Sequence, residues 1–103
     1  MKTYQHISQK EAYEYMHSGE PYILVDVRTP DEFNGGHIPG AINIPNETIL
    51  LFPPKQLPDK SATILVYCQS GRRSAYARQK LADRGYTDIR EFGGIMTWVY
   101  ETE

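Results

Sequence analysis

The stretch ILVYCQSGRRSAYARQKL, residues 64–81, joins an apolar run to a segment with helical spacing. The apolar run, TILVY at 63–67, is rich in β-branched side chains, which is typical of a strand buried on both faces of a parallel sheet. From Ser74 to Arg84 the apolar residues fall on one helical face, and Gly85 suits the position just past a helix end. The stretch therefore predicts a strand, a tight loop and a helix.

The first half of the chain repeats this alternation of apolar strand and capped helix. YILVDV at 22–27 predicts a second buried strand, and Thr29, Pro30 and Glu32 then form a helix start with a capping box. A helix of about ten residues is expected after Ser8, since Ser8 and Glu11 have the same spacing. Short strands are expected at 41–45 and 89–92, with an edge strand at 4–7. This alternation is typical of an α/β sandwich.

Composition limits the classes of protein to consider. The 103 residues predict one continuous domain, 1–103, because no linker or repeat interrupts the pattern. A net charge of −2 with interspersed signs argues against a nucleic-acid partner, and no apolar run approaches a membrane span or a signal peptide. A single cysteine cannot form an internal disulfide and suits a reducing compartment. We therefore expect a cytoplasmic protein with no membrane contact.

The lone cysteine, Cys68, follows the strand at 63–67, and Arg28 follows the strand at 22–27. In open parallel sheets, ligands bind beyond the carboxyl ends of the strands, so both residues are expected at one site. The loop made of Gln69, Ser70, Gly71, Arg72 and Arg73 leads directly into a helix. Its backbone amides, the positive helix end and the arginines would all favour a thiolate. Cys68 is therefore a candidate nucleophile.

Less specific interpretations exist for each of these residues. A free cysteine after a strand is often a small apolar core residue. A core cysteine, however, does not require a glycine and two arginines beside it, so the loop favours the nucleophile. Arg72 and Arg73 either bind an anionic donor or are solvated charges on the first helical turn. His37, in a turn rich in Gly and Pro, is interpreted as a hydrogen-bonded brace.

Three motifs in order resemble the rhodanese-like domains over nearly the whole chain. They are LVDVRTPDEFNGGHIPGAINIP (24–45), VYCQSGRRSA (66–75) and FGGIMTW (92–98). The resemblance implies a three-layer sandwich with a five-stranded, mainly parallel sheet between helices. It also implies a sulfurtransferase in which Cys68 carries sulfane sulfur as a persulfide, and Gln69 to Arg73 form the loop around it. Asp26 and Arg28 would belong to the scaffold beneath the site.

The implied reaction takes sulfur from a small donor such as thiosulfate, or from a protein persulfide, and passes it to a thiol or cyanide. The acceptor must be external, because the chain has no second cysteine. No cofactor is implied, and the three histidines lack the spacing of a metal site. Two alternatives stay open. One is a non-catalytic domain that docks a partner, and the other is a phosphatase of the same fold.

Loop length bears on the phosphatase alternative. The related phosphatases have five residues between the cysteine and the arginine of the loop, whereas four lie between Cys68 and Arg73. A smaller ring suits one additional sulfur atom better than a tetrahedral phosphate.

Overall fold

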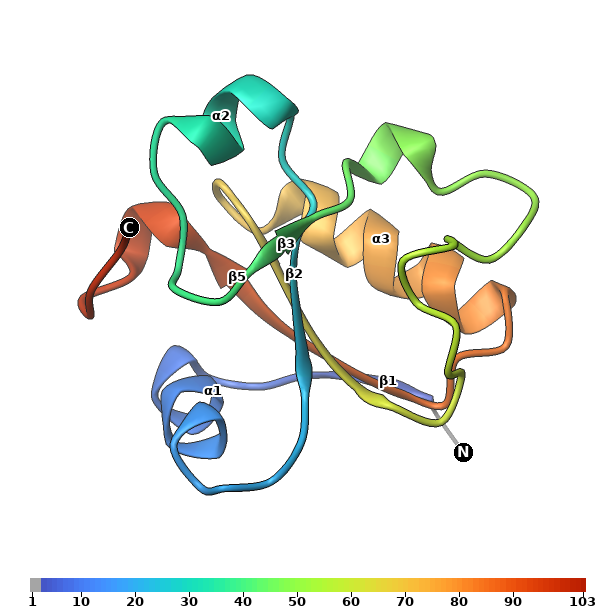
Figure 1. Cartoon of the computed structure of the whole chain (residues 1–103), viewed down its shortest axis with the longest axis horizontal. Coiled ribbons are helices and arrows are strands. Elements are labelled where there is room, and N and C mark those ends of the chain that lie inside the picture. Colours follow the sequence, from blue (N-terminus) through green and yellow to red (C-terminus); the bar gives the residue numbers. More distant parts are fainter. Residues whose placement is uncertain (1–2) are drawn as a thin grey trace.

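A computed structural model of the chain describes residues 3–103, which form one five-stranded sheet with helices against it (Figure 1). All four pairings between neighbouring strands are parallel, in the order β1-β5-β4-β2-β3. The strands are β1 (Tyr4–His6), β2 (Ile23–Asp26), β3 (Ile42–Asn43), β4 (Thr63–Cys68) and β5 (Asp88–Gly94). The predicted α/β class and five-stranded sheet are thus confirmed.

The helices begin close to where the sequence places them. They are α1 (Gln9–Met16), α2 (Pro30–Asn34) and α3 (Arg72–Asp83), with two short 3-10 turns, η1 (Asn46–Thr48) and η2 (Ile95–Thr97). Both predicted capping boxes form, one from Ser8 with Glu11 and one from Thr29 with Glu32. None of the helices in residues 3–103 is long and apolar enough to cross a membrane.

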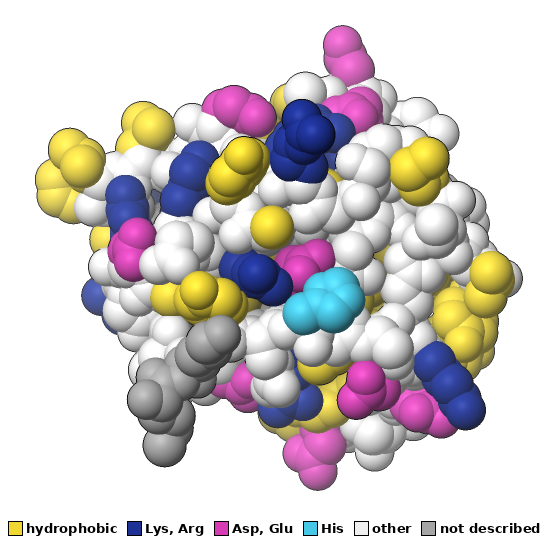
Figure 2. Space-filling model, turned by 180° about the vertical axis from the view of Figure 1, so that it is seen from behind, with side chains coloured by type: hydrophobic (Ala, Val, Ile, Leu, Met, Phe, Trp, Pro, Cys, Tyr) yellow, Lys and Arg dark blue, Asp and Glu magenta, His cyan; other side chains and the backbone are white. Residues whose placement is uncertain are grey.

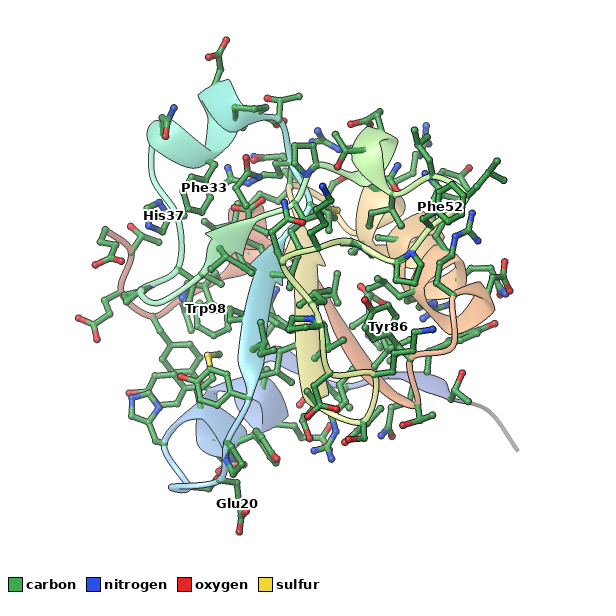
Figure 3. All side chains as sticks on the ribbon, turned by 45° about the vertical axis from the view of Figure 1, so that its right-hand side comes forward. Glu20, Phe33, His37, Phe52, Tyr86 and Trp98 are labelled. Atoms are coloured by element: carbon green, nitrogen blue, oxygen red, sulfur yellow. The ribbon has the colours of Figure 1, made fainter. Side chains whose placement is uncertain are left out.

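Two apolar cores lie on opposite faces of the sheet, which makes the three layers. Along β4, Ile64, Val66 and Cys68 belong to the core that includes Ala77 and Leu81 of α3. The alternate residues of β4, such as Tyr67, belong to the other core with residues of α1. Because side chains alternate along a strand, Cys68 is directed to the same side of the sheet as α3. Figure 3 shows Tyr86 within the side chains of the α3 side and Trp98 on the other side.

Several predicted boundaries differ from the structure. The strand expected at 41–45 is reduced to Ile42–Asn43, since Pro45 has no N–H for the ladder and the chain then enters η1. The strand expected at 89–92 is longer, Asp88–Gly94. The edge strand ends at His6, although the amide of Ile7 still donates to the carbonyl of Glu91.

Two boundary differences affect the loop after β4. Cys68 is the last residue of β4 and not the first residue after it, because a bulge lets it pair with Gly94. Helix α3 begins at Arg72, two residues earlier than expected, because Gly71 adopts a φ of 103° and acts as its N-cap. The true loop is therefore only Gln69 to Gly71, and both arginines belong to the helix.

Candidate active site

The carboxyl ends of β2, β4 and β5 meet at one edge of the sheet. They bring Asp26, Cys68 and Gly94 to this edge, and α3 starts soon after β4 ends. Both Cys68 and Asp26 are buried. The structure thus assembles the strand ends where the sequence predicts a site.

Cys68 is a free thiol with only 1% of its surface exposed. Its sulfur accepts a hydrogen bond from the Gly71 amide at 3.0 Å. The thiol donates to the Ser74 hydroxyl at 3.4 Å. One amide of the predicted cradle therefore contacts the sulfur, directly before the first turn of a twelve-residue helix. Such an arrangement stabilises negative charge on the sulfur or on an atom bound to it.

The end of β5 presses closely against the loop, and only glycine permits this. A Cβ on Gly94 would lie 2.2 Å from the carbonyl oxygen of Gln69. The same carbonyl accepts a hydrogen bond from the Met96 amide at 3.2 Å. The FGG motif therefore holds the loop in place by close backbone contact and not by side-chain chemistry.

Asp26 and Arg28 form an ion pair with each other, 2.7 Å between Oδ2 and Nη2, beneath the loop. Arg28 also donates to the Gly36 carbonyl at 2.6 Å and to the Gln69 side chain at 3.3 Å. Burial opposes the charge of Arg28, but its hydrogen bonds to Asp26 and the charge of that carboxylate raise its pKa above the usual value. The pair thus joins the end of β2 to the loop.

Glu32 binds Arg73 through both carboxylate oxygens, at 2.7 and 3.0 Å. This hydrogen-bonded pair lowers the pKa of Glu32 to about 2, with a further contribution from its capping contacts to Thr29. The same partner raises the pKa of Arg73. The Arg72 side chain is exposed and forms no hydrogen bond or ion pair with residues 3–103. The two adjacent arginines therefore differ: Arg73 links α3 to α2, and Arg72 faces solvent.

Helix α2, which carries Glu32, is held in turn by His37. Its Nδ1 lies 3.0 Å from the Phe33 carbonyl, and its Nε2 lies 3.3 Å from a carboxylate oxygen of Glu103. Figure 3 shows the rings of Phe33 and His37 lying together, with 3.9 Å between their centroids. These contacts confirm His37 as a hydrogen-bonded brace. In the described part of the chain, no three His, Cys, Asp or Glu side chains are grouped as a metal site would require.

Two buried polar residues near Cys68 were missed at the level of sequence. Ser74 is fully buried, and its hydroxyl lies between the sulfur and a carboxylate oxygen of Glu91, 3.0 Å away. Glu91 lies in β5 and is 3% exposed. A signal existed for each: Ser74 directly follows the arginines of the loop motif, and Glu91 is a charge within the strand expected at 89–92.

The family is shown by the comparison with known proteins. The sequence matches the family model of the rhodanese-like domain over residues 8–101. The chain belongs to the rhodanese family. Its three motifs, at 24–45, 66–75 and 92–98, all lie inside the matched rhodanese-like region.

Particular rhodanese relatives are similar over most of the chain. The thiosulfate sulfurtransferase PspE of Escherichia coli K12 is 39% identical over 71 residues, which are 69% of this chain and 68% of that protein. A solved rhodanese with anions from E. coli superposes with a TM-score of 0.71 at 32% identity, covering 81% of this chain and 98% of that one. The adenylyltransferase and sulfurtransferase UBA4 of Meyerozyma guilliermondii is 34% identical over 80% of this chain, which spans only 21% of its length.

Proposed function

We propose that this rhodanese-family chain is a sulfurtransferase and that Cys68 carries the transferred sulfur as a persulfide. The observation that carries the proposal is the geometry at Cys68. Cys68 lies at the end of a buried strand, and its sulfur accepts a hydrogen bond from the Gly71 amide at 3.0 Å. The N-terminus of α3 follows four residues later in the chain. The similarity to a thiosulfate sulfurtransferase at 39% identity supports the same reaction class.

In the proposed first step, the Cys68 thiolate attacks the outer sulfur of thiosulfate. The new bond joins Sγ to that sulfur, the bond between the two sulfur atoms of thiosulfate breaks, and its electron pair leaves with sulfite. The three negative charges of the reactants are conserved, one on the persulfide and two on sulfite. The Gly71 amide and the helix end then hold the terminal sulfur, on which the charge resides.

In the second step an acceptor thiolate or cyanide attacks the terminal sulfur and releases the Cys68 thiolate. The S–S bond of about 2.05 Å places the reactive sulfur farther from the buried Sγ, where an external acceptor can reach it. Such an acceptor is required because Cys68 is the only cysteine. A protein persulfide could replace thiosulfate as the donor by the same exchange.

Each residue from Gln69 to Arg73 has a proposed role. Arg72, which is exposed and unpaired among residues 3–103, binds the anionic donor. Arg73 positions the first turn of α3 through Glu32. Gln69, Ser70 and Gly71 form the ring around the sulfur, and the ion pair of Asp26 and Arg28 supports that ring from below.

The phosphatase alternative is disfavoured by the same contacts. A phosphatase of this kind needs the loop arginine to hold the phosphoryl oxygens, but the guanidinium of Arg73 is already bound on two nitrogens by Glu32. A domain that only docks a partner would not need the contact between the Gly71 amide and the sulfur. One domain over 1–103, a cytoplasmic location and the absence of a cofactor stay predictions from the sequence.

Steady-state assays distinguish the three functions. Thiosulfate with cyanide should give thiocyanate with the wild-type chain, and an aryl phosphate should be hydrolysed poorly. Cys68→Ser is the matched control, because the hydroxyl keeps the shape of the thiol and is not ionised near neutral pH. Thiocyanate formation that survives in Cys68→Ser, or efficient phosphate hydrolysis by the wild type, would overturn the proposal. No turnover of either substrate would favour docking.

A further inference from the structure

The buried carboxylate of Glu91 has four hydrogen-bonding or charged partners, and the proposed reaction has no use for it. One of its oxygens, Oε2, accepts the Ser74 hydroxyl at 3.0 Å and the Gly93 amide at 2.6 Å. The other, Oε1, lies 2.8 Å from Nδ1 of His6 and 3.2 Å from Nη1 of Arg78. Burial of a charge is costly, and the four partners of Glu91 offset this cost by hydrogen bonding and opposite charge.

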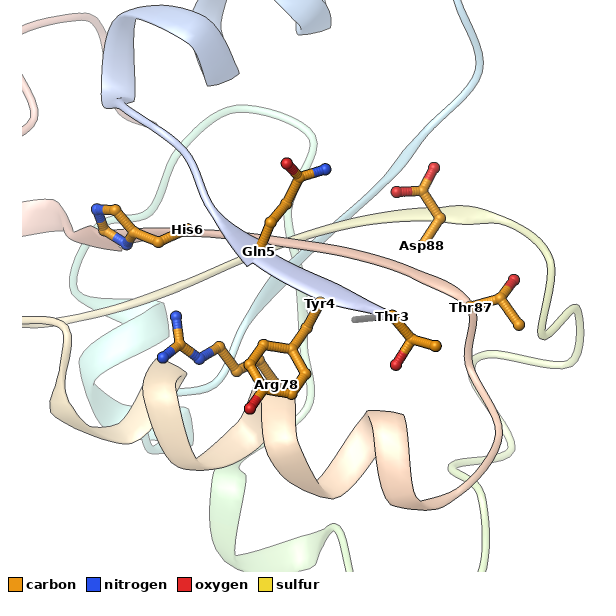
Figure 4. Close-up of a pocket in the computed structure, with 7 residues that line it drawn as sticks. All are labelled: Thr3, Tyr4, Gln5, His6, Arg78, Thr87 and Asp88. Atoms are coloured by element: carbon orange, nitrogen blue, oxygen red, sulfur yellow. The ribbon is translucent and has the colours of Figure 1, made fainter. Parts of the chain in front are cut away.

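The partners of Glu91 come from three elements and reach the surface on one side. Glu91 lies in β5, His6 in β1, and Ser74 and Arg78 in α3. Figure 4 shows His6 and Arg78 on the same side of β1. Figure 2 shows a histidine, a basic side chain and an acidic side chain grouped near the middle of one face of the molecule. The His6 side chain is 62% exposed. The cluster of Glu91 with His6, Ser74 and Arg78 therefore extends from solvent to the loop beside Cys68.

The Ser74 hydroxyl connects this cluster to the sulfur and has a single hydrogen to give. It lies 3.4 Å from the Cys68 sulfur and 3.0 Å from Glu91, and the carbonyls of Gly71 and Gly93 are 3.1 and 3.3 Å away. When Cys68 is a thiol, it donates to Ser74, and Ser74 can donate to Glu91. When Cys68 is a thiolate, it needs the same hydrogen that Glu91 accepts. The two anions therefore compete for one hydroxyl.

We propose that Glu91 is a positioning residue for Cys68: it keeps the Ser74 hydrogen directed away from the sulfur and so restrains formation of the thiolate. Glu91 does not contact the sulfur directly, and it acts through Ser74. The inference rests on the proposed function only in that it takes Cys68 as the reactive group.

The other charged groups around Glu91 and Cys68 determine the strength of this restraint. Arg78 and, when protonated, His6 balance the charge of Glu91 and weaken its hold on the Ser74 hydrogen. On the sulfur side, the Gly71 amide and the start of α3 favour the thiolate. The restraint thus opposes the groups that promote the thiolate.

Alkylation of Cys68 by iodoacetamide, followed against pH, measures the restraint directly, because only the thiolate reacts. In Glu91→Gln the pH of half-maximal alkylation should fall by about one unit, the size expected for removal of a neighbouring like charge. Asp88→Asn is the matched control. It removes a carboxylate from the same strand that is also paired with an arginine, Arg90, but lies at the end of β5 far from Gly94, the residue that pairs with Cys68. It should leave the alkylation profile unchanged.

A double-mutant comparison tests whether Ser74 carries the effect. In a Ser74→Ala background, Glu91→Gln should shift the half-maximal pH by much less than in the wild-type background. A full shift of the half-maximal pH in both backgrounds would show that Glu91 acts on Cys68 only through its charge and not through Ser74. No shift in either background would show that Glu91 does not act on Cys68. Either result would overturn the proposal.

Arg78→Gln covers the case in which Glu91→Gln does not fold. Loss of this cation should raise the half-maximal pH, and an unchanged profile would contradict the proposal. Formation of the persulfide from thiosulfate is measured separately. A shifted alkylation profile without any persulfide would contradict the proposed function alone, whereas a persulfide with unshifted profiles would contradict the role of Glu91 alone.

Discussion

Replacement of Gly94 by alanine should abolish most of the proposed sulfurtransferase activity without unfolding the protein. The backbone of Gly94 has φ −131° and ψ 150°, which alanine adopts without strain, so the effect is purely steric. The new Cβ would lie 2.2 Å from the Gln69 oxygen and 2.6 Å from the Cα of Ser70. All the clashing atoms belong to the backbone of Gln69 and Ser70, in the loop after Cys68, so no side chain can rotate away.

The size of the effect follows from the distance by which the loop must move. An ordinary Cβ contact lies at 3.4 Å or more, so the loop must retreat by roughly 1 Å, and displacements of that size cost on the order of a hundredfold in rate. The crowding should also lower the free energy of unfolding by about 1–3 kcal/mol. Persulfide formation from thiosulfate measures the first effect, and urea denaturation measures the second.

Gly19→Ala is the control for Gly94→Ala. Gly19 has a φ of 87°, and a methyl group added there would have nothing within 4 Å of it, so alanine should lower stability by about 1–2 kcal/mol through backbone strain alone. Its activity should stay at the wild-type level. The reasoning is refuted if Gly94→Ala transfers sulfur as fast as Gly19→Ala, because the close contact would then have no part in the geometry of the site.

Three further predictions concern α3 and its partners. Arg72→Ala should raise the KM for thiosulfate by roughly tenfold with little change in kcat, as steady-state kinetics would show, and an unchanged KM would contradict donor binding by this residue. The pKa of Glu32 is about 2 in the folded protein and near 4.5 in the unfolded chain. Its pair with Arg73 therefore stabilises the protein fully above pH 4.5, and this contribution is lost as the pH falls towards 2. In this partly exposed setting the loss should be about 1 kcal/mol in urea titrations, and Glu32→Gln should remove that part of the pH dependence. Leu81→Ala, in the fully buried face of α3, should cost about 2–5 kcal/mol in the same assay, and a smaller cost would mean that the helix is not packed as described.

Much of the fold could be predicted because local signals agree with the tertiary structure. The apolar runs at 22–27 and 63–67 became β2 and β4, since parallel strands covered on both faces need apolar residues at every position. Both capping boxes formed because their partners are three residues apart. The start of α3 was misplaced by two residues, since helical propensity alone does not reveal that Gly71 takes a left-handed conformation and caps the helix.

The contacts of the site were less predictable because they join distant segments. Arg73 and Glu32 are 41 residues apart, and His6 and Glu91 are 85 residues apart. Before the strand order is known, nothing shows that β1 lies beside β5 or that Glu91 faces Ser74. The loop that follows Cys68 in the sequence carries only positive charge, whereas the folded site places the buried carboxylate of Glu91 one hydroxyl away from the sulfur.

The mass of the tryptic peptide that contains Cys68, residues 61–72, tests the central claim most directly. The protein is incubated with thiosulfate, digested without reductant and compared with Cys68→Ser treated in the same way. We predict a gain of one sulfur atom on this peptide in the wild type, its loss after cyanide is added, and no gain in the variant. An unmodified peptide at saturating thiosulfate, from protein that is folded and whose Cys68 can still be alkylated, would contradict the assignment of Cys68 as the sulfur carrier.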